Sequence, residues 1–190
     1  MSILVIWASP NEDGLTSAAK NQVLKGIEQA DVKTQVVNLN KCSIERCRIC
    51  ENGWGTCRSK GECIIADDFA DIYEKIVNAD GVVFVTPVYW HDLAESLKCF
   101  MDRLRRCESA HNGFLKGKRC LLVACAGGTG NGAIKCLDKL EDTLRHMEMI
   151  AIDRLPVIQF NRSYMLPALV GAGMAFAKHI IGNSETHNRQ

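Results

Sequence analysis

The sequence predicts an α/β protein with a five-stranded parallel β-sheet and helices on both faces. Five short apolar or valine-rich segments alternate with five segments whose apolar residues recur at helical spacing. A helix between successive strands is typical of right-handed βαβ units, which make the strands parallel. The length of 190 residues lies within the single-domain range. We therefore expect one domain over residues 1–182, followed by a frayed polar tail at 183–190.

The first half of the chain begins with Ile3–Trp7, a continuous apolar run of the kind that a strand buried on both faces requires. Apolar residues then recur every four positions over Leu15–Ile27, which predicts an amphipathic helix. Gln35–Leu39 is short and valine-rich and is expected to be the second strand. Residues 40–66 follow neither period, and we expect an irregular insertion there.

The middle of the chain returns to regular elements. Asp67 or Asp68 is expected to cap a helix whose apolar face lies within Phe69–Ile76. Gly81–Thr86 reads as the third strand, and Leu93–Leu104 as the helix after it.

The last part of the chain repeats the same alternation. Arg119–Ala124 is expected to be the fourth strand, and apolar positions within Ala133–Met147 line the next helix. Ile150–Ile158 reads as a fifth strand interrupted by Pro156, and Leu166–Ile181 as the last helix.

Composition excludes several function classes. With 23 basic and 22 acidic residues the net charge is +1, which gives no reason to expect nucleic acid or an anionic membrane as a partner. The N-terminus lacks a basic signal region, and no apolar stretch is expected to approach a membrane span. A cytoplasmic protein is expected. Its ten cysteines, five of them between Cys42 and Cys63, favour thiol, metal or redox chemistry over disulfides.

Ligands of open parallel sheets bind beyond the carboxyl ends of the strands, near the point where strand order reverses. That rule selects three loops, which we name the first (Ala8–Ser17), second (Pro87–Asp92) and third (Cys125–Gly132) loops. The first loop carries the hydroxyls of Ser9 and Thr16 and opens a helix, a combination that suits an anion. The alternative is that both are only turn and cap residues.

The other two loops have different chemistry. In the second, Tyr89 and Trp90 could cover a flat heterocycle, or else form a subunit interface or cap the core. The third holds four glycines between residues 127 and 132, so a ligand can approach its backbone closely. Gly128-x-Gly130-x-x-Ala133, with Asp153 twenty residues further on, also imitates a dinucleotide fingerprint. That fingerprint belongs to the first strand-to-helix turn of its unit, however, and this is the fourth.

These loops and their surroundings resemble the NADPH-dependent FMN reductase family of the flavodoxin-like superfamily. The most specific match runs Asp67-Asp68-Phe69…Ile72-Tyr73…Ala79-Asp80-Gly81…Thr86-Pro87-Val88-Tyr89-Trp90…Leu97-Lys98…Asp102-Arg103. The resemblance implies a flavodoxin-like three-layer sandwich with strand order 2-1-3-4-5. It also implies that FMN is bound non-covalently and that the electron donor is either a nicotinamide nucleotide, NAD(P)H, or a protein. A homodimer or homotetramer is the assembly that the resemblance implies.

By position, the resemblance assigns FMN contacts to all three loops. The matching residues are Ser9, Asn11, Thr16 and Ser17 for the phosphate, Thr86, Pro87, Val88, Tyr89 and Trp90 for the ribityl chain and ring, and Ala126, Gly127, Gly128 and Gly130 for the polar edge of the ring. The first loop departs from the family pattern GSPR-x-x-GNT, because Ala8, Asn11 and Leu15 replace its Gly, Arg and Asn. Neutral hydrogen bonds must then hold the phosphate. We expect weaker FMN retention, since charge-assisted bonds are about twice as strong.

The cysteine-rich insertion resembles a branch of the same family, the iron–sulfur flavoproteins. Cys47-x2-Cys50-x6-Cys57-x5-Cys63 is similar to the four-cysteine segment that carries a [4Fe-4S] cluster there, but that branch has a tighter C-x2-C-x2-C run. Soft thiolates suit iron–sulfur or zinc, and free or packing thiols are the third alternative. The remaining five, Cys99, Cys107, Cys120, Cys125 and Cys136, are expected to be small buried hydrophobes.

Three functions are compatible with these features. The first is an FMN-dependent NAD(P)H oxidoreductase that passes electrons to a quinone, flavin, metal or nitro compound, with no side chain required as catalytic acid or base. The second is an iron–sulfur flavoprotein that exchanges electrons with a ferredoxin-like partner. The third is a non-catalytic protein that has kept the fold and lost FMN, for which the altered first loop is the only indication.

Overall fold

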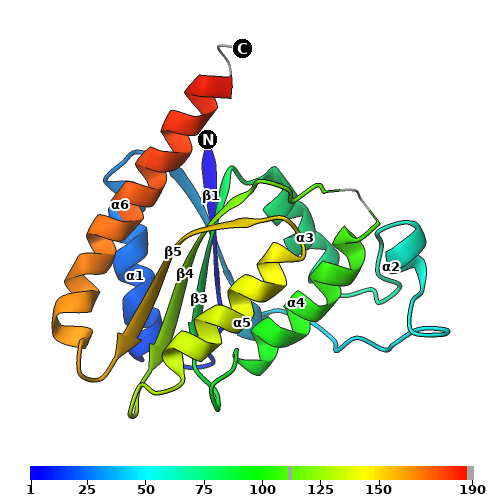
Figure 1. Ribbon diagram of the computed structural model, residues 1–190, viewed down its shortest axis with the longest axis horizontal. Coiled ribbons are helices and arrows are strands. Elements are labelled where there is room, and N and C mark those ends of the chain that lie inside the picture. The colour runs from blue at the N-terminus through cyan, green and yellow to red at the C-terminus, as the bar shows by residue number, and fades with distance from the viewer. Residues whose placement is uncertain (111–112, 188–190) are drawn as a thin grey trace.

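Five parallel strands form the centre of the computed structural model, which describes residues 1–110 and 113–187 (Figure 1). The strands are β1 (Ser2–Trp7), β2 (Lys33–Asn38), β3 (Gly81–Pro87), β4 (Arg119–Ala126) and β5 (Ile150–Ile158). They are ordered β2-β1-β3-β4-β5, and every neighbouring pair is parallel. The predicted fold class and strand order are confirmed. The second strand begins two residues earlier than expected and ends one residue earlier.

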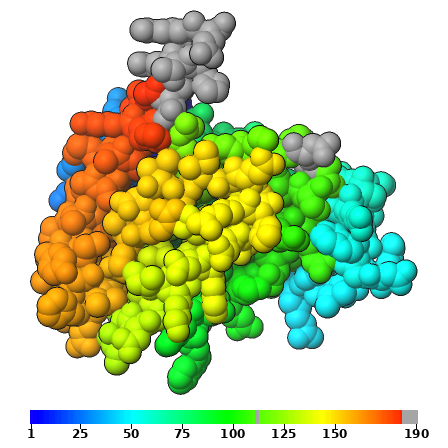
Figure 2. Space-filling view, viewed as in Figure 1, coloured from blue at the N-terminus to red at the C-terminus, as the bar shows by residue number. Residues whose placement is uncertain are grey.

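Helices cover both faces of the sheet and complete three layers (Figure 1). The long helices are α1 (Leu15–Glu28), α3 (Phe69–Asn78), α4 (Glu95–Glu108), α5 (Ala133–Arg145) and α6 (Arg162–His187). Helices α1 and α6 share one buried apolar cluster with the sheet, and α3, α4 and α5 share the other. Residues 40–66, which we call the cysteine segment, contain only a single helical turn, α2 (Thr56–Ser59), after the short 3-10 helix η1 (Leu39–Lys41). Figure 2 shows this segment, in cyan, projecting beside α4, in green.

The continuous apolar run of β1 has the physical cause that the sequence suggests. Leu4 and Ile6 point to the layer of α3, α4 and α5, whereas Ile3 and Val5 point to the layer of α1 and α6. All four side chains are buried. Because each such side chain contributes about 1.5–3 kcal/mol on burial, apolar residues are favoured at consecutive positions of a central strand.

The edge strand β5 tolerates a proline that a central strand would not. β5 runs through Pro156 without a break, so the predicted interruption is wrong. Pro156 pairs in register with Ala124 on one side only, because β5 is the edge of the sheet and proline needs no partner for its missing N–H there. The strand instead has a register shift opposite Cys120 and Leu121.

Helix α6 is longer than predicted and continues to His187, five residues into the expected polar tail; residues 188–190 lie outside the described chain. Arg162–Gly182 is long and apolar enough to cross a membrane by length and composition, so the expectation of no such stretch is wrong. The helix packs closely on α1. A Cβ at Gly26 would lie 2.0 Å from the Val170 carbonyl oxygen, and one at Gly173 would lie 2.3 Å from that of Val23. Only glycine permits this approach of the two backbones.

Candidate functional site

The first, second and third loops meet at one edge of the sheet, because they follow the neighbouring strands β1, β3 and β4. The strands of Figure 1 all point toward this lower edge. The Ala8 N–H donates to the Val85 carbonyl over 3.0 Å, and the Val88 N–H donates to the Cys125 carbonyl over 2.9 Å. Chain order reverses between β1 and β3, so this is the switch point at which open α/β sheets bind ligands.

The first loop places buried hydroxyls beside the start of α1. Ser9, Thr16 and Ser17 are each about 5 % exposed or less. The Ser9 hydroxyl accepts the Asn11 N–H at 3.2 Å and lies 3.1 Å from the Asn11 carbonyl, so it also stabilises the turn. Helix α1 has no side-chain cap among the described residues, which leaves its first N–H groups to an outside acceptor. The exposed Asn11 side chain accepts the Asp13 N–H through its Oδ1 at 3.1 Å, which stabilises the turn of the first loop.

The first and third loops also touch directly. The Thr16 hydroxyl contacts the thiol of Cys125, and burial raises the pKa of that thiol to about 12. Cys125 is therefore a neutral, packed thiol at pH 7. Burial raises the pKa of the other fully buried thiols as well, which confirms the small-hydrophobe interpretation for these positions; they are Cys107, Cys120 and Cys136. Cys99 is only half-buried.

The second loop is a tight, strained hairpin turn. Tyr89 and Asp92 exchange backbone hydrogen bonds of 3.0 and 2.9 Å, and the two residues between them, Trp90 and His91, have φ of 50° and 66°. Asn-Gly is the usual occupant of such a turn, and bulky residues there store strain that is common at functional sites. Trp90 is 97 % exposed, so it does not cap the core. Ligand contact or a subunit interface remains.

Thr86 has a structural role that the sequence does not reveal. Its side chain is fully buried, and its hydroxyl accepts the Ala94 N–H over 3.3 Å and donates to the Pro87 carbonyl over 2.9 Å. The hydrogen bond from Ala94 ties the end of β3 to the start of α4, and the bond to Pro87 is local to the end of β3. Thr86 therefore shapes the second loop from inside the protein.

Two glycines of the third loop pack closely against neighbouring residues, and two others have free space beside them. A Cβ at Gly130, whose φ is +81°, would lie 2.7 Å from Ile158, and one at Gly132 would lie 2.8 Å from His91. These two glycines let the loop pack on β5 and on the second loop. Gly127 and Gly128, by contrast, have no atom within 4 Å of an added Cβ. A ligand therefore has room above these two residues, beyond the buried end of β4 at Ala126.

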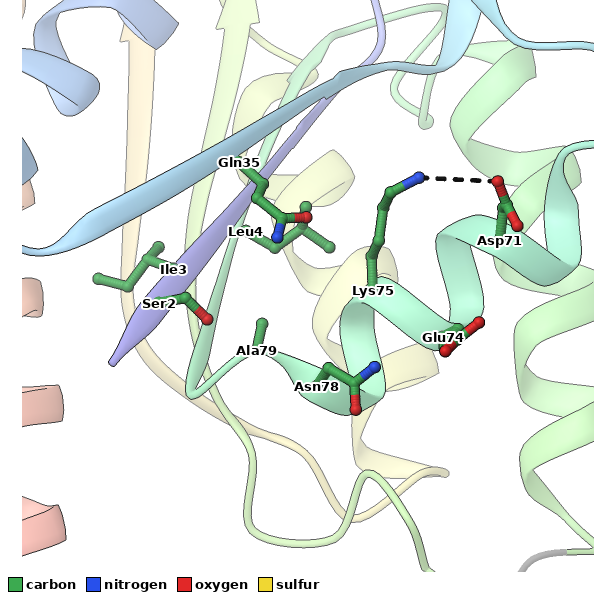
Figure 3. Close-up of a pocket in the computed structure, with 9 residues that line it drawn as sticks. All are labelled: Ser2, Ile3, Leu4, Gln35, Asp71, Glu74, Lys75, Asn78 and Ala79. Atoms are coloured by element: carbon green, nitrogen blue, oxygen red, sulfur yellow. Dashed lines mark ion pairs between the residues drawn. The ribbon is translucent and has the colours of Figure 1, made fainter.

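A hollow of about 520 Å³ adjoins the first two loops. Pro10 and Tyr89 line it from the loops, Ser96 and Cys99 from the start of α4, and Arg46 from the cysteine segment. The sequence does not predict that Ser96, Cys99 and Arg46 belong to a candidate site, because no motif connects them. A second cavity, of about 310 Å³, lies at the opposite edge of the sheet between the start of β1 and the end of α3, where Lys75 pairs with Asp71 (Figure 3). Its position excludes it from the switch point.

The four predicted metal-ligating cysteines, Cys47, Cys50, Cys57 and Cys63, line one small cavity, which we call the cysteine pocket. Its volume is only about 20 Å³, enough for about one water molecule. Within residues 1–110 and 113–187, no group of three or more metal-binding side chains is arranged to hold an ion. The donor chemistry is suitable, and Arg103 in the pocket wall has a buried Nε without a partner. In this arrangement, however, the cavity does not fit a four-iron cluster.

A buried ion pair attaches the cysteine segment to the body of the protein. The Arg103 guanidinium binds the Asp67 carboxylate through two hydrogen bonds of 2.6 and 2.9 Å, and the two side chains are 1 % and 3 % exposed. Asp67 also accepts the Glu45 N–H at 2.7 Å, and Asp68 accepts the Ser43 N–H at 2.6 Å. Burial opposes ionisation of Asp67, but the Arg103 and backbone hydrogen bonds outweigh it and lower its pKa. The acidic pair of the signature thus anchors the insertion, and Asp67 also accepts the Phe69 N–H at the start of α3.

Comparisons with known proteins agree with this geometry. The chain is 29 % identical over 130 residues to an iron–sulfur flavoprotein of Archaeoglobus fulgidus, covering 68 % of this chain and 56 % of that one. It is 29 % identical over 153 residues to one of Methanocaldococcus jannaschii, covering 80 % and 75 %. The chain thus spans between about half and three quarters of the length of these relatives.

Solved structures share the fold at lower identity. A flavodoxin from the domain Archaea superposes with a TM-score of 0.65 at 15 % identity, covering 95 % of this chain and 99 % of that one. An NAD(P)H:quinone oxidoreductase from Methanothermobacter marburgensis gives 0.67 at 18 % identity, covering 93 % and 96 %. The fold is flavodoxin-like. Residues 1–161 match the family described as NADPH-dependent FMN reductase, and the chain belongs to that family.

Proposed function

We propose that the protein is an FMN-dependent oxidoreductase that takes electrons from NAD(P)H and passes them to a small acceptor such as a quinone, flavin, metal ion or nitro compound. The observation that carries this proposal is the convergence of the first, second and third loops at the β1/β3 switch point, with open space over Gly127 and Gly128. Membership of the NADPH-dependent FMN reductase family supports it.

The first loop would hold the FMN phosphate. The uncapped first turn of α1 offers N–H groups, and Ser9, Thr16 and Ser17 lie beside it. No cation of this loop is available, because Asn11 stands at the position of the family's arginine and the nearby Lys41 pairs with Glu12 at 3.4 Å. This charge balance supports the expectation that FMN is retained more weakly than in relatives with an arginine there.

The second and third loops would hold the flavin ring. FMN supplies the hydride and electron chemistry when it is bound. The strained turn presents Tyr89 and Trp90 at the ring, while the backbone of Gly127 and Gly128 can approach its polar edge. N–H donors placed there would stabilise negative charge that develops on reduction. The protein thus needs no side chain as catalytic acid or base.

Two glycines give a matched test of this site. Gly128→Val would fill the open space over the third loop, and Gly171→Val would fill equally open space on α6. We expect Gly128→Val to abolish the yellow colour of FMN-loaded protein and Gly171→Val to retain it. Anaerobic NADPH or NADH should then bleach the flavin of the wild type. A wild-type protein that stays colourless in excess FMN would contradict the proposal and favour a non-catalytic protein.

The cysteine pocket favours a second candidate, an electron carrier with an iron–sulfur cluster and a ferredoxin-like partner. The four cysteines do share one pocket, and the relatives cited above are named iron–sulfur flavoproteins. Binding of a cluster would require the pocket to open. An anaerobic preparation with iron and sulfide, whose flavin is reduced by ferredoxin but not by nicotinamide, would support this candidate. A preparation with only flavin bands and no iron would exclude it.

We also propose a cytoplasmic homodimer or homotetramer assembled through the carboxyl edge of the sheet. Large apolar side chains gather around that edge, with Trp90, Phe160, Tyr164 and Ile134 exposed by 97, 84, 58 and 56 %. Apolar exposure of this extent is typical of protein interfaces. Light scattering should give a multiple of the 21.0 kDa chain mass, and Trp90→Lys should reduce the assembled fraction.

A further inference from the structure

The cysteine pocket contains a fifth thiol that the spacing of the motif does not include. Cys107 of α4 lines it together with the four cysteines of the cysteine segment. Cys107 is 1 % exposed and belongs to the apolar core under α4, and Cys57 and Cys63 pack against that core from the other side of the pocket. All ten cysteines of the chain are free thiols in this structure. The pocket therefore brings reduced thiols from two distant parts of the chain around a cavity of about 20 Å³.

Cys63 is the nearest of these thiols to Cys107. Burial raises the pKa of Cys107 to about 12, and charge on Cys63 raises it further, with smaller effects from Cys57 and Cys47. Because Coulomb energy falls with distance, this order places Cys63 closest. Arg103 and Cys107 lie one turn apart on the same side of α4, and both line the pocket with Cys63.

Arg103 supplies a fixed positive charge to Cys63. Burial opposes that charge, but the hydrogen bond with Asp67 and then the contact with Cys63 outweigh burial and raise the pKa of Arg103. The Arg103 Nε is buried and has no hydrogen-bond partner within residues 1–110 and 113–187. A sulfur that attacks a disulfide carries negative charge, which a neighbouring cation stabilises. Cys63 is half-buried and can be reached from solvent, whereas Cys107 cannot.

We infer that Cys63 and Cys107 form a thiol–disulfide exchange site, which a small-molecule disulfide oxidises to a Cys63–Cys107 disulfide. The Cys63 sulfur attacks the small disulfide, whose S–S bond breaks, so that one small thiol leaves and a mixed disulfide remains on Cys63. The Cys107 sulfur then attacks the Cys63 sulfur and expels the second small thiol. The two cysteines lose two electrons and two protons, and the small disulfide gains them as it becomes two thiols.

The disulfide joins the cysteine segment covalently to α4, beside the Asp67–Arg103 pair that already attaches it. Disulfides of proteins without an export signal are usually transient and serve in redox sensing, which agrees with a reversible exchange. A pocket too small for a four-iron cluster still has room for a bond between two of its own sulfurs. The exchange requires neither FMN nor NAD(P)H, so it stands independently of the proposed function.

Oxidised glutathione is the probe that tests this site in the purified full chain. After incubation, N-ethylmaleimide blocks the remaining thiols, and mass spectrometry of the digested protein identifies linked and modified peptides. We expect one linked peptide, Cys63–Cys107, with the loss of two of the ten thiols, the release of two glutathione molecules per chain, and reversal by dithiothreitol. This measurement on the wild type does not depend on the folding of any variant.

Two alanine variants separate the roles of the sulfurs. Cys107→Ala should keep one glutathione on Cys63, because the second attack is lost. Cys136→Ala is the matched control, since Cys136 is an equally buried thiol on α5 that does not line the pocket, and it should form the Cys63–Cys107 link as the wild type does. Circular dichroism checks that both variants are folded.

Four results would overturn the inference. They are a wild-type linked peptide that joins a different pair of cysteines, glutathione that stays on Cys63 of the wild type, release of both glutathione molecules by Cys107→Ala, and thiols that exchange only after a chelator has removed iron. The last result would assign these sulfurs to a metal and favour the iron–sulfur candidate.

Discussion

The ion pair between Asp67 and Arg103 gives the sharpest test of how the cysteine segment is held. Asp67→Asn keeps the size of the side chain but leaves the Arg103 charge buried, at 1 % exposure, without its counter-ion. Removing one partner of a buried pair costs about 3–5 kcal/mol, which is a large part of the roughly 5–15 kcal/mol that stabilises a domain. We therefore expect the free energy of unfolding to fall by about 3–5 kcal/mol.

Urea unfolding at pH 7, followed by circular dichroism, measures this loss. Asp71→Asn is the matched control, because Asp71 is 80 % exposed and lies 3.9 Å from Lys75. Its effect should stay within about 0.5 kcal/mol. Limited proteolysis should cut residues 40–66 faster in Asp67→Asn than in the control. Equal unfolding midpoints and m-values for the two variants would refute the anchoring role of the pair.

The pH dependence of the same variant supplies a second check. Because the pKa of Asp67 is lowered in the folded protein, its stabilisation is present above the ordinary value of about 3.9 and is lost as the pH falls through the folded value. The difference between wild type and Asp67→Asn should therefore shrink between pH 5 and strongly acidic pH. A difference that is constant over that range would contradict an electrostatic origin.

Three further predictions concern packing. Gly130→Ala should lower the free energy of unfolding by about 1–3 kcal/mol, since its φ is +81° and its Cβ would meet Ile158, whereas Gly127→Ala should change it by less than about 0.5 kcal/mol; thermal unfolding compares them. Tyr73→Phe should cost about 1–3 kcal/mol in urea unfolding, because it removes the 2.6 Å hydrogen bond to the buried Glu108 carboxylate. Mass spectrometry after thiol labelling at pH 8 should find the buried cysteines unmodified in folded protein and modified in urea; these are Cys107, Cys120, Cys125 and Cys136. Labelling of Cys125 in folded protein would contradict its packed position.

Local pattern was sufficient for most of the fold. The periodicity of apolar residues predicts the five strands and the five long helices. Burial of one or two faces of an element imposes a repeat of apolar residues that can be recognised within a short stretch of sequence. The errors lie where burial is one-sided or the helix interface is glycine-rich. Pro156 suggests an interruption of the strand, but an edge strand tolerates proline. The sequence around Gly173 does not indicate how closely α6 packs on α1.

The sequence identifies the three loops of the candidate site but not the role of each residue in them. The resemblance assigned Thr86 and Asn11 to FMN, yet the side chains of both are engaged in hydrogen bonds that shape the loops. Trp90 could have been a core cap until its exposure excluded that role. Arg46 matches no motif, so the sequence does not indicate that it lines the hollow beside the first two loops.

The sequence by itself determined the order of the elements, the family, and the three loops at the carboxyl edge, since all of these depend on residues close together in the chain. Only the tertiary structure decided that four cysteines share a pocket too small for a cluster, that Asp67 meets Arg103, and that Arg46 and Arg105 line one hollow beside α4. Asp67 and Arg103 are 36 positions apart in the sequence, and Arg46 and Arg105 are 59 positions apart. Distances of that kind are set by how helices pack on the sheet, and local patterns of hydrophobicity do not specify them.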